Sequence, residues 1–223
     1  AVHTTSMPIA TMSSSPASTT FLLESVRCSS RYNCSTRYTP GMSRREVLLD
    51  QVTDHVLEHG LIGLTLRPLA AAIGTSDRML IYHFGSRDAL VSAVVAGATE
   101  RAVACIEALP SAPGVRAAVN TLWEAYGEQP LDSCLDVYVQ AAATGLFGGE
   151  PYLSEARASN ERWSAALTDY LVRSGAPLHR AARVVTLVDS ALYGFHLDLA
   201  TDRPEELVRG VDDLARAAQA LAG

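Results

Sequence analysis

The chain has 223 residues, of which 48% are hydrophobic and 19% are charged, as is typical of a soluble globular protein with a sizeable core. Its net charge of −6 excludes a protein that coats nucleic acid by bulk charge, so any contact with DNA must come from a local basic patch. All 18 basic residues are arginine, which excludes every site that needs a lysine.

Residues 1–42 differ from the rest because serine, threonine and proline dominate and no helical period is present. The short apolar run 21–23 is interrupted at once by Glu24, so it does not form a signal peptide. This composition predicts a disordered extension over residues 1–42. No apolar run in the chain approaches the roughly 20 residues of a membrane span, and we expect a cytoplasmic protein without a membrane partner.

From Ser43 onward the pattern is helical. Ser43 and Glu46 make a capping box for a first helix that ends at Gly60. Thr65 is positioned to cap a second helix, and either Thr75 or Ser76 a third. The helices expected after the first run over Leu66–Ile73, Asp77–His83, Arg87–Ala108, Gly114–Gly127, Leu131–Thr144, Leu153–Ser174, Pro177–Ala200 and Pro204–Leu221.

No strand pattern is present, so the sequence predicts an all-α protein in two parts. Residues 43–88 form a three-helix domain with a helix-turn-helix, and residues 89–223 form a helical bundle. Residues 43–90 contain five arginines and six acids, a weak charge balance for a DNA-binding segment. Three of the acids, Asp50, Asp54 and Glu58, share one face of the first helix, which we expect to be solvated.

The third helix has an outer face suited to the major groove of DNA. Leu80 and Phe84 point inward, which places Arg78 and Tyr82 on the opposite face with Met79 at its flank. Arginine can bridge guanine O6 and N7, and methionine can meet a thymine methyl. The arginines around this face fit contacts with phosphates, and the helix N-termini at Thr65 and Ser76 add backbone donors.

The segment 65–90, TLRPLAAAIGTSDRMLIYHFGSRDAL, resembles the signature of the TetR family of bacterial repressors. It shares the Thr-x-Arg helix start, the Ala-x-x-x-Gly turn, the aromatic-His-Phe end and the Gly-Ser-basic-acid-Ala-Leu entry to the fourth helix. The resemblance implies a homodimer that binds an inverted-repeat DNA operator and is released by a small effector, with no catalytic role and no cofactor. The predicted DNA-binding residues are Arg44, Arg45, Thr65, Arg67, Thr75, Ser76, Asp77, Arg78, Met79, Tyr82, His83 and Arg87.

The last two helices are candidates for the dimer interface. The segment 177–200 is apolar nearly all round, and apolar residues of the last helix recur at steps of four and three, as in a helix–helix seam. An intramolecular core would explain the same pattern. The candidate interface residues are Val184, Val188, Leu192, Leu207, Val211, Leu214 and Leu221.

The effector is expected to be a small hydrophobic or amphipathic molecule held in an apolar pocket with few polar anchors. Most aromatic residues of the bundle are candidates for this pocket, as are two polar residues in apolar sequence. Each could instead be ordinary core, and the two polar residues could pair across the dimer. The candidates are Trp123, Tyr126, Tyr138, Phe147, Trp163, Asp189, Tyr193 and His196.

The expected mechanism is a population shift, in which the effector changes the spacing of the two recognition helices and the fourth helix acts as the lever. Two other functional classes fit parts of the sequence. His55, Glu58 and His59 match the His-x-x-Glu-His motif of some zinc hydrolases, although a third ligand would be needed. A helical module that binds protein through its helix-turn-helix is the other alternative.

Overall fold

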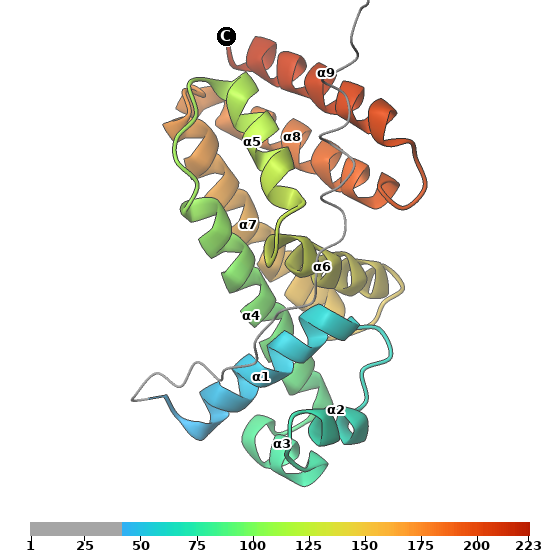
Figure 1. The fold of residues 1–223 in the computed structure, drawn as a ribbon. Coiled ribbons are helices and arrows are strands. Elements are labelled where there is room, and N and C mark those ends of the chain that lie inside the picture. Colours follow the sequence, from blue (N-terminus) through green and yellow to red (C-terminus); the bar gives the residue numbers. More distant parts are fainter. Residues whose placement is uncertain (1–41) are drawn as a thin grey trace, which may run out of the picture. The chain divides into compact units, whose positions relative to one another are not determined.

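The computed structural model describes residues 42–223, which form nine α-helices and no strand (Figure 1). This confirms the predicted all-α class. The predicted extension 1–42 lies, apart from Met42, outside the described residues. The helices are α1 (Arg44–His59), α2 (Leu66–Ala72), α3 (Asp77–Phe84), α4 (Arg87–Glu107), α5 (Val115–Tyr126), α6 (Leu131–Leu146), α7 (Tyr152–Arg173), α8 (Leu178–Asp198) and α9 (Pro204–Ala222).

The helix ends follow the local signals in the sequence. Both bonds of the predicted capping box are present, from the Ser43 N–H to Glu46 Oε2 at 2.6 Å and from the Glu46 N–H to Ser43 Oγ at 3.3 Å. Ser76 caps α3 by accepting the Met79 N–H, whereas the side chain of Thr65 makes no capping hydrogen bond with α2. The second helix therefore starts at Thr65 as predicted, but its hydroxyl is left free at the surface.

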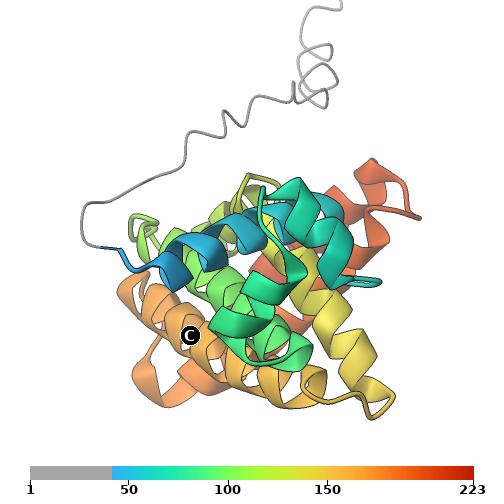
Figure 2. The same cartoon turned by 90° about the horizontal axis from the view of Figure 1, so that it is seen from below.

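The helix-turn-helix is packed on a core that includes part of the bundle. Leu48, Leu80 and Phe84 from α1 and α3 are buried together with apolar residues in the first half of α4. Val137 and Ala141 of α6 belong to the same core. Figure 2, seen from the opposite end to α9, shows α1, α2 and α3 nearest the viewer and crossing the end of the bundle. Helix α6 therefore supports the helix-turn-helix directly.

A second core joins α5, α7, α8 and α9. Its largest buried side chains include Leu122, Tyr126, Leu167 and Tyr170, which are all 1% exposed or less. Helix α9 lies against α5 and α8, and α7 lies along α4 (Figure 1). The result is a bundle in which the apolar seam of α9 already has partners within one chain.

Most of the predicted dimer residues are buried within one chain for this reason. Six of them, on α8 and α9, are 0–7% exposed within a single chain, and Leu221 is half-buried. A side chain covered by its own chain cannot contact a second copy without unfolding part of the bundle. The regular seam reports the intramolecular packing of α9 against α5 and α8, the alternative that the sequence left open. The residues concerned are Val184, Val188, Leu192, Leu207, Val211, Leu214 and Leu221.

Helix α4 is, among the described helices, the one that is long and apolar enough to cross a membrane by length and composition alone. Its apolar residues are used otherwise. Leu90, Val91, Val94 and Ile106 are each 0–1% exposed and pack in the two cores. The apolar character of α4 is therefore that of a central helix shared by the helix-turn-helix and the bundle.

Candidate functional site

Helix α3 presents the outer face that the sequence predicts. Tyr82 is 77% exposed, and Met79 and Ile81 are 39% and 38% exposed, while Leu80 is fully buried. Arg78 is also exposed. Asp77 accepts the backbone N–H of Arg78 at 2.8 Å, so this acid serves the first turn of its own helix. The face that remains offers one arginine, one tyrosine and apolar side chains.

The residues predicted around this face fall into two groups. Arg44, Thr65 and Arg67 are exposed, and Thr75 is half-buried. The side chains of these four residues make no hydrogen bond or ion pair within the described residues. The guanidinium of Arg45 lies 5.0 Å from the ring centroid of Phe84, which holds that exposed side chain at the end of α3. The geometry leaves Arg44 and Arg67 free for phosphates.

Arg87 and His83 are placed differently from what the sequence predicts. Arg87 donates from Nε and Nη2 to the carbonyl oxygen of Leu64, at 3.2 and 3.1 Å, and from Nη2 to the hydroxyl of Tyr152 at 3.3 Å. Nε2 of His83 is buried and has no partner within the described residues. Arg87 therefore ties the helix-turn-helix to α7, and Nε2 of His83 is not available to a ligand at the surface.

Of the three acids on α1, Asp54 and Glu58 are exposed as predicted, and Asp50 is half-buried. Arg101 of α4 pairs with both Asp50 and Asp54, with 2.6 Å between its Nη1 and Asp54 Oδ1. Two of the six acids between residues 43 and 90 thus share the single positive charge of an arginine outside that segment. The count of five arginines and six acids in residues 43–90 therefore makes the exposed surface of this segment look more negative than it is.

A glutamine from the bundle holds the loop between α1 and α2. Oε1 of Gln140 in α6 accepts the backbone N–H of Leu61 at 2.7 Å and of Ile62 at 2.9 Å. A Cβ on Gly60 would lie 3.1 Å from the same oxygen, so a larger residue there would force Gln140 to move. Sequence reasoning missed Gln140, because nothing local indicates a partner 79 residues away.

Six of the eight predicted effector residues come together from four helices. Tyr126 of α5, Tyr138 of α6, Trp163 of α7 and two further residues of α8 are grouped around the carboxylate of Asp189, and we call these six residues the Asp189 cluster. Ring centroids are 6.0 Å apart for Tyr126 and Trp163, and 5.1 Å apart for Tyr138 and Tyr193. The cluster consists of Tyr126, Tyr138, Trp163, Asp189, Tyr193 and His196.

The polar atoms of the Asp189 cluster are incompletely paired. The indole N–H of Trp163 donates to Asp189 Oδ1 at 2.8 Å, and His196 Nε2 lies 3.2 Å from Asp136 Oδ1. The hydroxyl of Tyr126 and Nδ1 of His196 are buried without a partner within the described residues. Such groups cost roughly 1–3 kcal/mol each, so the cluster is not optimised for stability.

Burial shifts the acid–base behaviour of this group. It raises the pKa of the Asp189 carboxyl, an effect that the Trp163 N–H partly opposes. Burial, together with the negative charge of Asp189, raises the pKa values of Tyr126 and Tyr138. The tyrosines therefore remain protonated donors around a carboxyl group that is costly to ionise.

The other two predicted effector residues lie outside the cluster. Phe147 follows α6 and is 92% exposed, so its assignment to a pocket is wrong. Trp123 packs edge-on against Phe195 with centroids 6.2 Å apart. Helical periodicity could not separate these residues from the cluster, because position at a helix end and choice of neighbour are tertiary properties.

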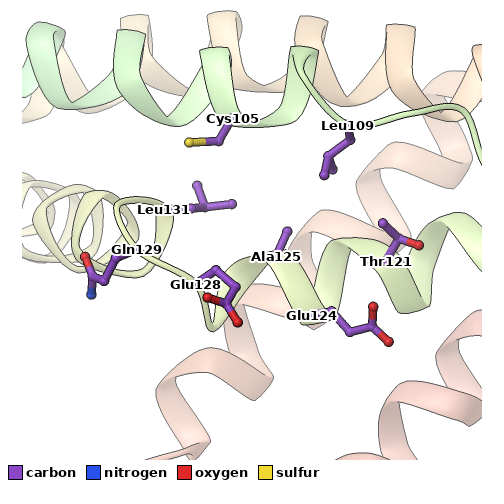
Figure 3. Close-up of a pocket in the computed structure, with 8 residues that line it drawn as sticks. All are labelled: Cys105, Leu109, Thr121, Glu124, Ala125, Glu128, Gln129 and Leu131. Carbon is purple, nitrogen blue, oxygen red and sulfur yellow. The ribbon is translucent and has the colours of Figure 1, made fainter. Parts of the chain in front are cut away.

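A cavity of about 490 Å³ lies between the end of α4, α5 and the start of α6. In Figure 3, Cys105 and Leu109 point from α4 toward Leu131 and Ala125, and Glu124 and Glu128 lie at the opposite side. None of the predicted effector residues lines this cavity. Its lining is Cys105, Leu109, Thr121, Glu124, Ala125, Glu128, Gln129 and Leu131.

The histidines of the His-x-x-Glu-His segment are stacked on one another, with ring centroids 4.1 Å apart. His59 Nδ1 lies 2.9 Å from the carbonyl oxygen of His55, and Glu58 is exposed. Within residues 42–223 no group of three or more histidine, cysteine, aspartate or glutamate side chains is arranged to hold a metal ion. The geometry does not favour the zinc alternative.

Comparison with known proteins favours a DNA-binding regulator over a helical module that binds protein. Residues 55–94, from the middle of α1 into α4, match the family model described as bacterial regulatory proteins of the tetR family. Residues 55–94 therefore carry the segment that is typical of TetR-family regulatory proteins. No curated protein sequence matches the chain.

Solved structures share the TetR-family fold over both parts of the chain. A TetR-family transcriptional regulator from Rhodococcus sp. is 19% identical, with a TM-score of 0.60 over 81% of this chain and 98% of that one. GusR of Salmonella enterica is 19% identical, with a TM-score of 0.61 over 83% and 98%. The multidrug binding protein EbrR, in complex with imidazole, is 24% identical, with a TM-score of 0.57 over 82% and 96%.

The match places the family's DNA-binding domain on the helices whose outer face was described above. It covers all of α2 and α3, the α1–α2 loop and Arg87, whereas Gln140, which also holds that loop, lies outside the match. At these identities the solved structures show the fold alone, so the details of the Asp189 cluster and of the cavity are properties of this chain.

The first prediction concerns the stability cost of Asp189. Because the folded state raises the pKa of this carboxyl, the folded protein holds its proton more tightly than the unfolded chain does. The charged form therefore lowers stability once the pH exceeds the unfolded-chain pKa of about 3.9. Asp189→Asn should raise the melting temperature near neutral pH, and the gain should shrink as the pH falls through the raised folded-state pKa toward that of the unfolded chain.

The control for this experiment is Asp198→Asn near the end of the same helix, where no side-chain hydrogen bond is lost within the described residues. Thermal unfolding, followed by circular dichroism across the pH range, gives the melting temperatures of both variants and their dependence on pH. A lower melting temperature for Asp189→Asn at neutral pH would show that the bond from Trp163 outweighs the cost of burial.

Proposed function

We propose that this TetR-family chain is a homodimeric repressor that binds an inverted-repeat operator in the cytoplasm and is released by a small organic effector. Residues 43–88 would bind DNA, and residues 89–223 would bind the effector and form the dimer. The observation that carries the proposal is the exposed face of α3 within the matched segment 55–94. No catalytic role is proposed.

The exposed side chains divide into base readers and phosphate contacts. Arg78, Met79 and Tyr82 project from the middle of α3 and would meet base edges in the major groove. Arg44 and Arg67 lie on α1 and α2 and would neutralise phosphates. The proposal drops Arg87 and His83 from the set of direct contacts, since both face the protein interior or its loops.

Removal of the guanidinium of Arg78 tests the assignment of α3. Arg78→Ala should weaken specific operator binding by ~1–3 kcal/mol and relax the preference at one base pair of each half-site. Arg157→Ala on the exposed side of α7 removes the same charge away from α3 and should leave affinity unchanged. Fluorescence anisotropy with DNA from beside the gene, repeated over a salt series, measures both effects.

If binding to every DNA is weak and insensitive to sequence, and Arg78→Ala behaves like Arg157→Ala, the DNA-reading role of α3 is contradicted. A protein-binding role for the helix-turn-helix would then be favoured. A steep loss of affinity with salt is expected for a true DNA contact, because released counterions drive the association.

The outward face of α8 is the proposed dimer contact, in place of the buried residues that the sequence suggested. Along α8 the exposed residues Arg183, Leu187, Ser190 and Leu197, with the half-buried Gly194, follow one stripe at helical spacing. Two exposed leucines in that stripe, at 37% and 54% exposure, have no cover within the described chain. A second copy related by a twofold axis would cover both.

Gly194 gives an independent reason to propose the outward face of α8 as the dimer contact. Of four glycines inside helices, three are explained by close neighbours, such as Gly210, where a Cβ would lie 3.0 Å from the Phe195 ring. A Cβ at Gly194 would have no other atom within 4 Å among the described residues. A glycine in a helix interior costs roughly 0.5–1 kcal/mol relative to alanine. Close approach of a partner helix would account for that cost.

Gly194→Leu therefore distinguishes an effect on folding from an effect on dimerisation. The leucine meets no other part of the described chain at its Cβ, so the helical content should be unchanged. Overpacking at the proposed contact should raise the dimer dissociation constant by about tenfold or more. Sedimentation velocity over a concentration series measures it, with Ala158→Leu on the exposed face of α7 as the control. An unchanged dissociation constant would place the dimer contact elsewhere.

Helix α6 links the proposed effector site to the DNA-binding domain. Asp136 contacts His196 of the Asp189 cluster, and Gln140, one turn further along the same face, holds the amides of Leu61 and Ile62. A ligand that moved α6 by a small distance would change both contacts at once. Together with α4, this helix is the proposed route by which the effector alters the orientation of α3.

Gln140→Leu should loosen this link without removing the core contacts around it. The amides of Leu61 and Ile62 lose their acceptor, so their hydrogen exchange should speed up by about tenfold. Operator affinity should fall because α2 and α3 are held less firmly. Gln219→Leu is the matched control, since Gln219 accepts the Arg116 N–H at 3.2 Å in the contact of α5 with α9. Equal operator affinities for the two variants would refute the role of α6.

A further inference from the structure

The Asp189 cluster has a chemistry that limits which effector it accepts. One carboxylate lies among the rings of Tyr126, Trp163 and Tyr193, and within the described residues it receives one hydrogen bond, from the indole of Trp163. No hydrogen bond or ion pair in residues 42–223 brings an arginine to the cluster, and the chain has no lysine. Within the described residues no arginine forms an ion pair with Asp189.

The electron-rich faces of aromatic rings and a nearby carboxylate are together complementary to a positive charge that carries apolar groups. An anionic ligand would instead face Asp189 at close range in a medium of low polarity, where repulsion is strong. A neutral ligand would leave the buried charge of Asp189 uncompensated. The chemistry therefore discriminates between three classes of effector.

We infer that the Asp189 cluster recognises an organic cation, whose charge is neutralised by Asp189 and whose body lies against the rings of Tyr126, Trp163 and Tyr193. This inference rests on the proposed function of the bundle as an effector domain and names the class of its ligand. The cation would supply the missing counter-charge, and its polar groups would be within reach of the buried Tyr126 hydroxyl and His196 Nδ1, which lack partners.

The site is closed in the unliganded chain, because the rings pack against one another. Tyr138 and Tyr193 are only half-buried and lie on α6 and α8, so outward movement of these two rings opens the cluster without crossing the core. Movement of Tyr138 would also disturb α6, which carries Gln140. Entry of the cation and release of the α1–α2 loop are then parts of one displacement.

The test uses the full chain with Trp123→Phe, so that Trp163 is the one remaining tryptophan and reports on the cluster. Two probes of nearly equal shape are titrated at neutral pH, N-methylacridinium, a permanent cation, and acridine, which is uncharged there. Quenching of Trp163 gives both dissociation constants. The cation should bind about tenfold more tightly or better. Equal or tighter binding of acridine would overturn the inference.

The carboxylate is then changed in the same background. Asp189→Asn keeps an acceptor for Trp163 and should reduce the preference for the cation to near one, while Asp189→Glu should keep much of it. Asp198→Asn on the same helix is the control and should behave as the parent. A preference that persists in Asp189→Asn would place the cation elsewhere and overturn the inference. If Asp189→Asn did not fold, the comparison of the two probes on the parent would still show whether the cluster prefers the cation.

Failure of this inference can be told apart from failure of the proposed function. Operator binding is measured on the Trp123→Phe parent without any probe, so that DNA binding and ligand preference are determined independently. Specific DNA binding without a preference for the cation overturns the ligand class alone. A preference for the cation without specific DNA binding supports the ligand class and contradicts the repressor.

Discussion

The loop between α1 and α2 leaves three of its backbone groups to be paired by side chains of other helices, and the orientation of the helix-turn-helix depends on these contacts. The amides of Leu61 and Ile62 are accepted by Gln140 of α6, and the carbonyl of Leu64 is satisfied by Arg87 of α4. Because unpaired buried backbone groups are costly, the loop is fixed to the bundle rather than to its own helices. The orientation of α3 is therefore a property of the whole described chain.

In the Asp189 cluster, by contrast, polar groups in the interior remain without partners. A carboxyl group that is costly to ionise, a phenol and a ring nitrogen without partners lie where leucine or phenylalanine would pack more stably. The second core, with side chains such as Leu122 and Leu167 fully buried, is large enough to carry this cost. Groups that are unsatisfied in a native core are expected where a ligand supplies what is missing.

Local signals in the sequence were sufficient for the helices and for the exposed outer face of α3. Ser43, Ser76 and Gly60 mark helix ends by hydrogen bonds and backbone angles that involve only near neighbours, and the inward position of Leu80 fixes where Arg78 and Tyr82 point. The same local reasoning failed wherever a distant partner decides the role of a side chain.

Arg87 looks like a free basic residue until Leu64 and Tyr152 are placed beside it. The seam of α9 looks like an interface until α5 and α8 cover it. The Asp189 cluster was predicted only in part. Asp189 and His196 were identified as polar residues in apolar sequence, whereas the exclusion of Phe147 required the tertiary structure. Periodicity identifies an apolar face but not the surface that buries it.

Helix α8 explains why ligand and dimer are expected to depend on each other. Asp189, Tyr193 and His196 turn toward the cluster, and each is followed directly by a residue of the outward stripe, Ser190, Gly194 and Leu197. A rigid helix cannot rotate or shift one of these faces without moving the other. A cation that displaced Tyr193 would therefore change the geometry of the proposed dimer contact as well as that of α6. Since two recognition helices must lie about 34 Å apart to enter successive major grooves, a small change at that contact is enough to alter operator binding.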